Sequence, residues 1–362
     1  MSPRRRIRVP FALFAIAATL LIPMPANASA HATGANPCPA GTVWQRPVST
    51  SRLSDGGTLH HYVFGGDATD VAVPPVGFSP GGASDAALAR YGMPPRPSGG
   101  ADLAAWNADM ASWHRTPDRG LCTTDAKADA DQPGTVPSDA DPTGARFSLN
   151  WGGFITDETS NTYIAVQGDW TQPSVSDTIC NNETHAAWVG LGGYNTDRLI
   201  QDGTAYLRGS TTPVAWYEYL GTGGVGINLT TMPSVTVHKG DRIHSYVVIQ
   251  RSSGQTTFYV ADNTTGTSQT VIKTLSVSTY YDGTSSDFID ERLSYGSIQN
   301  LYNFVHTSWT NTKVQNLAGT WLTLGSRNEI TLDMENIDND ILVSPGTMTS
   351  TTTFLDDYKQ CG

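Results

Sequence analysis

From about Phe147 onward, apolar and polar positions alternate in short runs that are rich in β-branched and aromatic residues. Gly, Asn, Asp and Pro separate the runs, and no amphipathic helical pattern of ten or more residues occurs among them. This pattern predicts an all-β protein, an antiparallel β-sandwich, because a parallel α/β sheet would need helices. The predicted strands are Thr162–Gln167, His185–Leu191, Val214–Leu220, Ser234–Val237, Arg242–Gln250, Thr256–Val260, Phe288–Leu293, Trp321–Leu324 and Glu329–Leu332.

Two short polar segments between these runs have the composition of turns. They are Lys239-Gly240-Asp241 and Asp262-Asn263-Thr264-Thr265-Gly266. Gly, Asn and Asp tolerate the backbone angles that tight turns require, so we expect both segments to close hairpins.

Residues 31–122 have a different pattern and predict a small, partly helical N-terminal region. Ser84 can cap a short helix over Asp85–Tyr91, which Gly92 would end. Between residues 102 and 114, apolar side chains recur at helical spacing and form one face, which must pack against another part of the molecule. That face consists of Leu103, Trp106, Met110 and Trp113.

Residues 123–146 contain many Asp and Pro residues and almost no large apolar side chain. We expect a solvated acidic linker that a protease can reach, with the β-sandwich domain beginning at residue 147. Its acidic residues are Asp125, Asp129, Asp131, Asp139 and Asp141.

The first 30 residues have the features of a secretory signal peptide. Four Arg residues precede an apolar segment, Phe11–Ile22, and Ala28-Ser29-Ala30 is a small-residue cleavage site. No later apolar stretch reaches the length of a membrane span. We therefore expect a secreted, extracellular protein without a membrane anchor, made in an environment where disulfides persist.

The 362 residues carry 22 basic and 33 acidic side chains, a formal net charge of −11. Four of the basic residues lie in the predicted signal peptide, which leaves 18 against 33 acidic residues, a formal −15. No basic stripe is present to neutralise phosphates, which argues against a nucleic-acid partner. Few basic residues also limit charge repulsion at acid pH, although simple solubility explains the same composition equally well.

Four cysteines, Cys38, Cys122, Cys180 and Cys361, have none of the spacings typical of zinc sites. They allow three disulfide pairings. The division into two regions favours Cys38–Cys122 and Cys180–Cys361. Asn182, Asn228 and Asn263 are N-glycosylation sequons, which matter only in a host that glycosylates.

Familiar motifs of hydrolases and nucleotide-binding proteins are absent from the sequence. It contains no H-E-x-x-H, no phosphate-binding P-loop and no G-x-G-x-x-G before a helix. The one G-x-S-x-G, at 77–81, lies in a Pro-rich stretch without the strand and helix that a nucleophile elbow needs. We interpret His185, His238 and His244 as ordinary strand residues, and we expect no metal and no cofactor.

Two predicted strands place an acid on an aromatic or apolar face. Alternation puts Glu218 beside Trp216, and Glu291 beside Ile289, with Asp290 on the opposite face from Glu291. A carboxyl group among apolar neighbours has a raised pKa and can act as a general acid or base. The same pattern also fits an edge-strand acid in water or a buried Glu–Arg pair, so spacing alone leaves the choice open.

Six motifs in order resemble the glutamic peptidase (eqolisin) family, which includes the scytalidoglutamic and aspergilloglutamic peptidases. The resemblance covers residues 147–293 clearly, and we expect it to extend to the C-terminus, which makes about 60% of the chain. The region before residue 146 resembles the N-terminal portion of bacterial members, which suggests a bacterial-type member. The motifs are Asn150-Trp151-Gly152-Gly153, Val166-Gln167-Gly168-Asp169-Trp170-Thr171-Gln172-Pro173, Trp188-Val189-Gly190-Leu191-Gly192-Gly193, Leu199-Ile200-Gln201-Asp202-Gly203, Ala215-Trp216-Tyr217-Glu218-Tyr219 and Asp287-Phe288-Ile289-Asp290-Glu291.

The resemblance implies a fold of two large antiparallel sheets, a lectin-like jelly roll, and a peptidase that uses neither metal nor cofactor. It implies Gln201 and Glu291 as the catalytic pair and protein or peptide substrates. The positions that it assigns to the substrate cleft are Trp151, Trp188, Trp216 and Glu218. We expect a monomer.

Two positions depart from the family pattern. Gly192 stands where fungal members have an Asp near the active site, and Asp202 follows Gln201 where a small or neutral residue is usual. Alternation puts Asp202 on the face opposite Gln201, so it need not disturb the catalytic pair. The pH optimum therefore stays open.

The implied chemistry is coherent for peptide hydrolysis. Glu291, as a carboxylate, can take a proton from water and return it to the leaving amine. Gln201 offers an amide N–H to the oxyanion and an amide oxygen that orients the water. These roles point to an endopeptidase active at acidic pH. The alternatives are a glycan-binding or glycan-cleaving sandwich that uses Glu218 and Glu291, and a non-enzymatic adhesion module.

The N-terminal region lies where the family carries a propeptide. We expect residues 31–122 to dock on the sandwich and keep the peptidase inactive until the linker 123–146 is cut. A permanent N-terminal appendage is the alternative.

Overall fold

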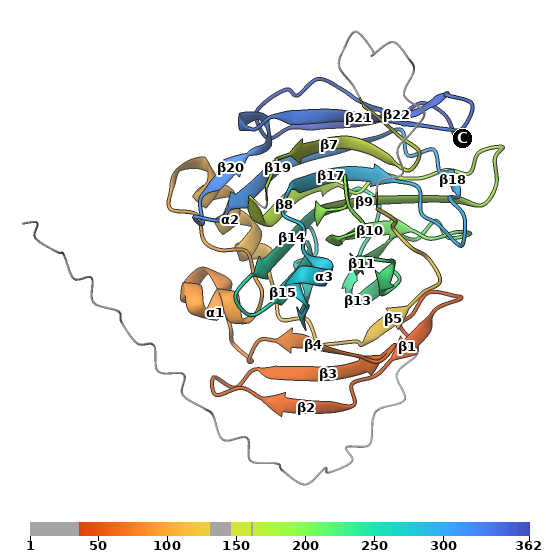
Figure 1. Ribbon diagram of the computed structural model, residues 1–362. Helices are drawn as coiled ribbons and strands as arrows, with labels where there is room; N and C mark the ends of the chain where they lie inside the picture. The colour runs from red at the N-terminus through yellow and green to blue at the C-terminus, as the bar shows by residue number, and fades with distance from the viewer. Residues whose placement is uncertain (1–35, 131–145, 161) are drawn as a thin grey trace, which may run out of the picture. The chain divides into compact units, whose positions relative to one another are not determined.

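The computed structural model describes residues 36–130, 146–160 and 162–362. The predicted signal peptide and residues 131–145 of the predicted linker lie outside the described residues. Within them the chain is built mainly of β-strands (Figure 1).

The first sheet has eight strands between residues 151 and 345, and in the order given below each strand is antiparallel to the next. The central strand β17 lies between β7 and β9, and the sheet ends at β13. In spatial order the strands are β22 (Ile341–Pro345), β21 (Glu329–Glu335), β7 (Trp151–Asp157), β17 (Ser285–Glu291), β9 (Glu183–Gly192), β10 (Leu199–Tyr206), β11 (Val214–Gly221) and β13 (Thr230–Thr236).

The second sheet is also antiparallel and ends at β16. Its strands are β23 (Phe354–Tyr358), β19 (His306–Asn316), β8 (Tyr163–Thr171), β14 (Arg242–Gln250), β15 (Gln255–Asp262) and β16 (Thr267–Thr274). Pairing of β22 with β23 joins the two sheets at one edge. The short elements are β6 (Arg146–Ser148), β12 (Val225–Gly226), α3 (Val277–Tyr280), β18 (Asn300–Leu301), β20 (Trp321–Thr323) and the 3₁₀ turn η2 (Leu324–Ser326).

Apolar side chains from the inner faces of both sheets form the main core. Trp170 from β8 and Trp309 from β19 lie with ring centroids 4.9 Å apart, and Phe288 from β17 packs on Trp309. Tyr217 from β11 meets Phe258 from β15. Alternation along each strand supplies these inward side chains, as expected for a β-sandwich, and the sequence-based fold prediction is confirmed.

The N-terminal region contains more strand than the sequence predicted, and its strands extend both sheets. β4 pairs with β16, the last strand of the second sheet, and β5 pairs with β13, the last strand of the first. The strands of this region are β1 (Val43–Gln45), β2 (Ser49–Arg52), β3 (Thr58–Phe64), β4 (Asp67–Val73) and β5 (Leu121–Thr123). Figure 1 shows them in red to yellow, with β2, β3 and β4 side by side.

Two helices, α1 (Asp85–Arg90) and α2 (Gly100–Ser112), follow the 3₁₀ turn η1 (Pro80–Gly82). Ser84 caps α1 as predicted: its Oγ accepts a hydrogen bond from the Ala87 amide at 3.2 Å. The predicted apolar face of α2 is buried through Trp106 and Met110 in one cluster with Tyr246 and Tyr259. Since Tyr246 and Tyr259 alternate with the core residues of β14 and β15, α2 covers the outer face of the second sheet.

Both predicted disulfides, Cys38–Cys122 and Cys180–Cys361, are present. The segment 262–266 closes the β15–β16 hairpin as predicted. The prediction of a hairpin at 239–241 is wrong: β13 pairs with β11 and β5, whereas β14 pairs with β8 and β15. That turn carries the chain from one sheet to the other.

Candidate active site

The outer face of the first sheet carries the polar side chains that the sequence singled out. Gln201 on β10 lies directly opposite Glu218 on β11, and Glu291 ends β17 beside Trp151 of β7. Alternation places the floor of the site on this same face, where Trp151, Trp188 and Trp216 belong to one buried cluster. All six side chains are fully buried.

Gln201 is held through its amide nitrogen. Nε2 donates to Glu218 Oε2 at 2.9 Å and to the carbonyl oxygen of Ala128 at 3.0 Å. Opposite it on β9 is Gly190, where an added Cβ would lie 2.8 Å from the Trp188 ring and 3.3 Å from the Gln201 Cβ. Glycine at this position therefore leaves room for the Gln201 and Trp188 side chains.

Glu291 accepts one hydrogen bond on each carboxyl oxygen. Trp188 Nε1 donates to Oε2 at 2.8 Å, and Asn150 Nδ2 donates to Oε1 at 3.1 Å. Burial raises the pKa of Glu291 well above its usual range, and the negative charges of Asp129 and Glu218 raise it further. β17 is a central strand, so the edge-strand interpretation of this acid is wrong.

The pKa of Glu218 is also raised, first by burial and then by Asp129. Its Oε2 accepts from Gln201 and from the Ala128 amide, which lies 3.1 Å away. Its Oε1 has no hydrogen-bond partner among the described residues. A single oxygen of Glu218 therefore holds the Gln201 side chain and the main-chain N–H of Ala128 in place by hydrogen bonds.

The two departures from the family pattern have structural explanations. Asp202 faces the core, as alternation predicts, and accepts from Ser245 Oγ and from the Tyr259 amide. Gly192 has φ +87°, and a Cβ there would lie 2.2 Å from the carbonyl oxygen of Arg198. The backbone at 192 therefore excludes an aspartate side chain in this conformation.

The three histidines lie outside this face. His185 on β9 is buried and bonds through Nε2 to Asp290 at 2.6 Å, which also accepts from Thr307. His244 on β14 bonds to Asp169 at 2.5 Å. The prediction of a strand position is wrong for His238, which follows the end of β13 and contacts Asp241 in the turn.

Residues 124–130, here called the strap, run through the site between its two sides. Gln201 and Glu218 contact Ala128, whereas Trp151 Nε1 donates to the Asp129 carbonyl at 3.0 Å. Thr124, Ala126 and Ala128 are buried. The prediction of a solvated linker is therefore wrong for these residues, because the walls that bury them come from distant strands.

The family model for peptidase A4 matches residues 149–357, more than half of the chain and the part that forms this site. This chain belongs to the peptidase A4 family. The family is that of the glutamic peptidases, so the peptidase is a glutamic endopeptidase, and the glycan-directed and non-enzymatic alternatives are not supported.

Solved structures similar to this peptidase include three glutamic peptidases. Scytalido-glutamic peptidase with a peptide-based transition state analogue is 22% identical over 58% of this chain and 98% of that one, with a TM-score of 0.48. SCP-B, an eqolisin in complex with the tripeptide Ala-Ile-His, is 21% identical over 58% and 98%, with a TM-score of 0.46. Aspergilloglutamic peptidase from Aspergillus niger is 24% identical over 49% and 99%, with a TM-score of 0.42. No curated protein sequence matches the chain.

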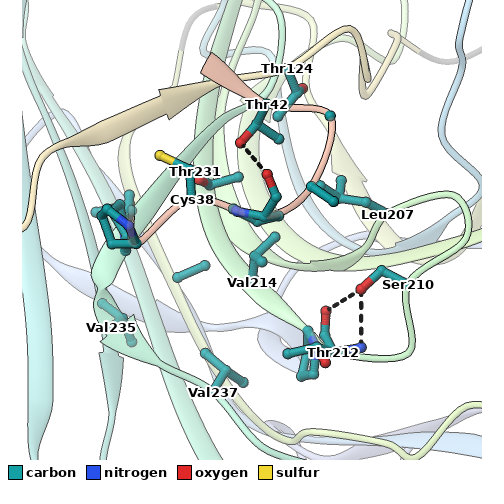
Figure 2. A pocket seen from close by; sticks show the side chains of 18 of the residues that line it. Cys38, Thr42, Thr124, Leu207, Ser210, Thr212, Val214, Thr231, Val235 and Val237 are labelled. Atoms are coloured by element: carbon teal, nitrogen blue, oxygen red, sulfur yellow. Dashed lines mark hydrogen bonds between the residues drawn. The ribbon is translucent and has the colours of Figure 1, made fainter. Parts of the chain in front are cut away.

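A pocket of about 720 Å³ lies beside the N-terminal end of the strap. Figure 2 shows its walls: Cys38 and Thr42 from the N-terminal region, and Val214, Thr231 and Val235 from the sandwich. Gln201 and Glu291 do not line it, and part of its wall, residues 37–42 and Arg119, comes from the region that we predicted to be removed. We therefore assign the candidate active site of the peptidase to the strap-filled face.

Among the described residues, no helix is long and apolar enough to cross a membrane. The same part of the chain holds no cluster of three or more His, Cys, Asp or Glu side chains that could bind a metal ion.

Proposed function

We propose that this peptidase is a secreted endopeptidase that cleaves proteins at acidic pH with Glu291 as general base and Gln201 as oxyanion donor. One observation carries the proposal: Gln201 donates its amide N–H to a peptide carbonyl, that of Ala128, at 3.0 Å. An amide that already binds a carbonyl oxygen is suited to bind the more negative oxygen of a tetrahedral intermediate.

The surroundings of Glu291 support its role beside the same peptide. Asn150 Nδ2 donates both to Glu291 Oε1 at 3.1 Å and to the carbonyl of Asp129 at 3.3 Å. A peptide that binds Gln201 with one carbonyl therefore has its next carbonyl next to the partner of Glu291. This arrangement puts the intervening peptide bond between the two proposed catalytic groups.

The proposed reaction needs only water and these two side chains. The Glu291 carboxylate removes a proton from water as the water oxygen attacks the carbonyl carbon. Gln201 Nε2 stabilises the oxyanion, and its Oε1, which has no partner among the described residues, can orient the water. The C–N bond then breaks as the Glu291 carboxyl group gives its proton to the amine.

Acid activity is part of the proposal, because the carboxyl group formed on Glu291 must still be acidic enough to give its proton to the leaving amine. The raised pKa of Glu291 sets the lower limit, since the fraction of carboxylate falls as the pH drops below that pKa. The signal-like residues 1–30 and the two disulfides support secretion.

The test is casein hydrolysis by the full chain after incubation at about pH 3, below the reference pKa of carboxyl groups. Glu291→Gln keeps the shape of the side chain and removes its basicity, so we expect activity to fall by orders of magnitude with folding unchanged. Glu329→Gln, an exposed acid on β21, is the matched control and should retain activity. An active, folded Glu291→Gln variant would overturn the assignment.

A further inference from the structure

The strap is hydrogen-bonded on both sides by the walls of the active site, in the way that an added strand is. On one side the Leu229 amide donates to the Ala126 carbonyl at 3.0 Å, and Ala128 is bound through both its N–H and its carbonyl. On the other side Lys127 and Ser294 exchange two main-chain hydrogen bonds of 3.0 and 2.9 Å. The main-chain N–H and carbonyl groups of the strap therefore make the hydrogen bonds that an extended peptide substrate would make.

Side chains of the strap alternate between the sheet and the outside. Ala126 and Ala128 are fully buried against the cluster that contains Trp151, Trp188 and Trp216. Lys127 and Asp129 point away from that cluster, and their side chains form an ion pair of 3.1 Å. The sheet thus surrounds the two alanine side chains, whereas the alternate positions are open to larger residues.

One peptide bond of the strap follows the carbonyl that Gln201 binds and precedes the Asp129 and Ala130 carbonyls, to both of which Asn150 donates at 3.3 Å. The Ala128 carbonyl accepts a hydrogen bond from Gln201. The Asp129 carbonyl accepts from Trp151 and from Asn150. Asn150 also donates to Glu291. The bond between these carbonyls is Ala128–Asp129.

We propose that the strap is the first substrate of the peptidase, cut at Ala128–Asp129, and that its preferred substrates are extended peptides with alanine-sized residues at the scissile carbonyl and two residues before it. This inference rests on the proposed roles of Gln201 and Glu291. Water adds its oxygen to the Ala128 carbonyl carbon, and the bond to the Asp129 nitrogen breaks. Ala128 gains a carboxyl group, and Asp129 becomes a new amino terminus.

The disulfides make a cut in the strap visible without reduction, and the new N-terminus identifies the bond. Cys38–Cys122 lies wholly before the bond, and Cys180–Cys361 lies wholly after it. One cut at 128 therefore leaves no covalent link between the N-terminal region and the sandwich, and the two pieces should separate on a non-reducing denaturing gel.

The experiment acidifies the purified full chain to about pH 3 and follows the new N-terminus, the non-reducing gel and casein hydrolysis together. We expect an N-terminus at Asp129 that appears with casein activity. Casein hydrolysis by an intact chain, or by one cut elsewhere, overturns the inference and leaves the proposed function standing. A chain that hydrolyses neither casein nor itself overturns the proposed function.

Two neighbouring substitutions to the same residue provide the matched control. Ala128→Leu places a larger side chain against the tryptophans and should slow the cut at this bond about tenfold or more. Lys127→Leu points outward and should leave the rate nearly unchanged. Equal rates in the two variants would overturn the inference.

A synthetic peptide with the sequence of residues 124–130 tests the same preference without a substitution in the protein, so the result does not depend on whether a variant folds. Added to the acid-activated wild-type protein, it should be cut after Ala128, and the peptide carrying the Ala128→Leu change should be cut at least about tenfold more slowly. An uncut wild-type peptide in a preparation that digests casein would overturn the inferred preference.

Discussion

At the residue scale, Glu218 and Glu291 are both buried carboxyl groups on one face, but their partners give them different tasks. Among the described residues, Glu291 accepts from Trp188 and Asn150, neither of which belongs to the strap. Glu218 uses one oxygen to hold Gln201 and the Ala128 amide together. We therefore assign Glu218 as a positioning residue rather than as a base.

Substitutions at Gln201 and Glu218 should separate these tasks. Gln201→Ala removes the oxyanion donor, so we expect kcat for casein to fall by about 10²–10³. Glu218→Gln keeps a carbonyl oxygen that can accept both hydrogen bonds, so its loss should be much smaller. Steady-state kinetics on both variants checks the order. The reverse order would contradict both assignments.

At the element scale, the strands that carry the site were predictable because they alternate strictly, and the strap was not. Alternation placed Glu218, Glu291 and Asp202 on their correct faces. The strap consists of small and charged residues without a large apolar side chain, and Ala126 is buried because the loop at Leu229 and the tryptophans surround it. Likewise, β3 and β4 were missed: β3 pairs with β4, and β4 is joined to the sandwich by pairing with β16, far along the chain.

The surface on which α2 packs could not be predicted from the sequence. Spacing identified the apolar face with Trp106 and Met110, but not which surface would cover it. We expected residues 31–122 to dock on the sandwich, without naming the surface; the helix packs on the second sheet, against Tyr246 and Tyr259. The inhibition that we proposed would therefore come from the strap, which lies in the predicted linker, and not from the helix.

Truncation of Trp106 tests this separation of helix and site. Its side chain is buried and Nε1 donates to the Pro94 carbonyl at 3.2 Å, so Trp106→Ala should lower the free energy of unfolding of the full chain by about 3–5 kcal/mol. Urea unfolding measures this loss. After acid activation, casein hydrolysis should equal that of the wild type. A folded variant that activates but has lost its activity would contradict the assignment.

At the scale of the whole molecule, the sandwich contains carboxyl groups whose pKa values burial raises well above their usual range: Asp202, Glu218, Glu291 and Asp356. A raised folded-state pKa adds stability that is fully present below the unfolded pKa of about 4 and is lost as the pH rises through the folded value. These groups therefore stabilise the fold at acid pH.

We accordingly expect the free energy of unfolding to fall as the pH rises from about 4 toward neutrality. Urea unfolding at several pH values, at constant ionic strength, measures the slope. Asp356→Asn removes a buried carboxyl group whose pKa is raised by burial and by the charge of Asp290. In this variant the free energy of unfolding should therefore change less with pH. A wild-type chain that is more stable at neutral pH than at acid pH would contradict the expectation.

The pairing of β4 with β16 and of β5 with β13 has a consequence for how the sandwich forms. If residues up to 128 leave after the cut, the two sheets lose their outermost partners, and the N–H and carbonyl groups along β13 and β16 become open edges. The mature enzyme would then lack β4 and β5, the strands that paired with the edges of its two sheets when the full chain folded. Its lifetime would be set by the rate of unfolding rather than by an equilibrium, so a single denaturation event would be hard to reverse.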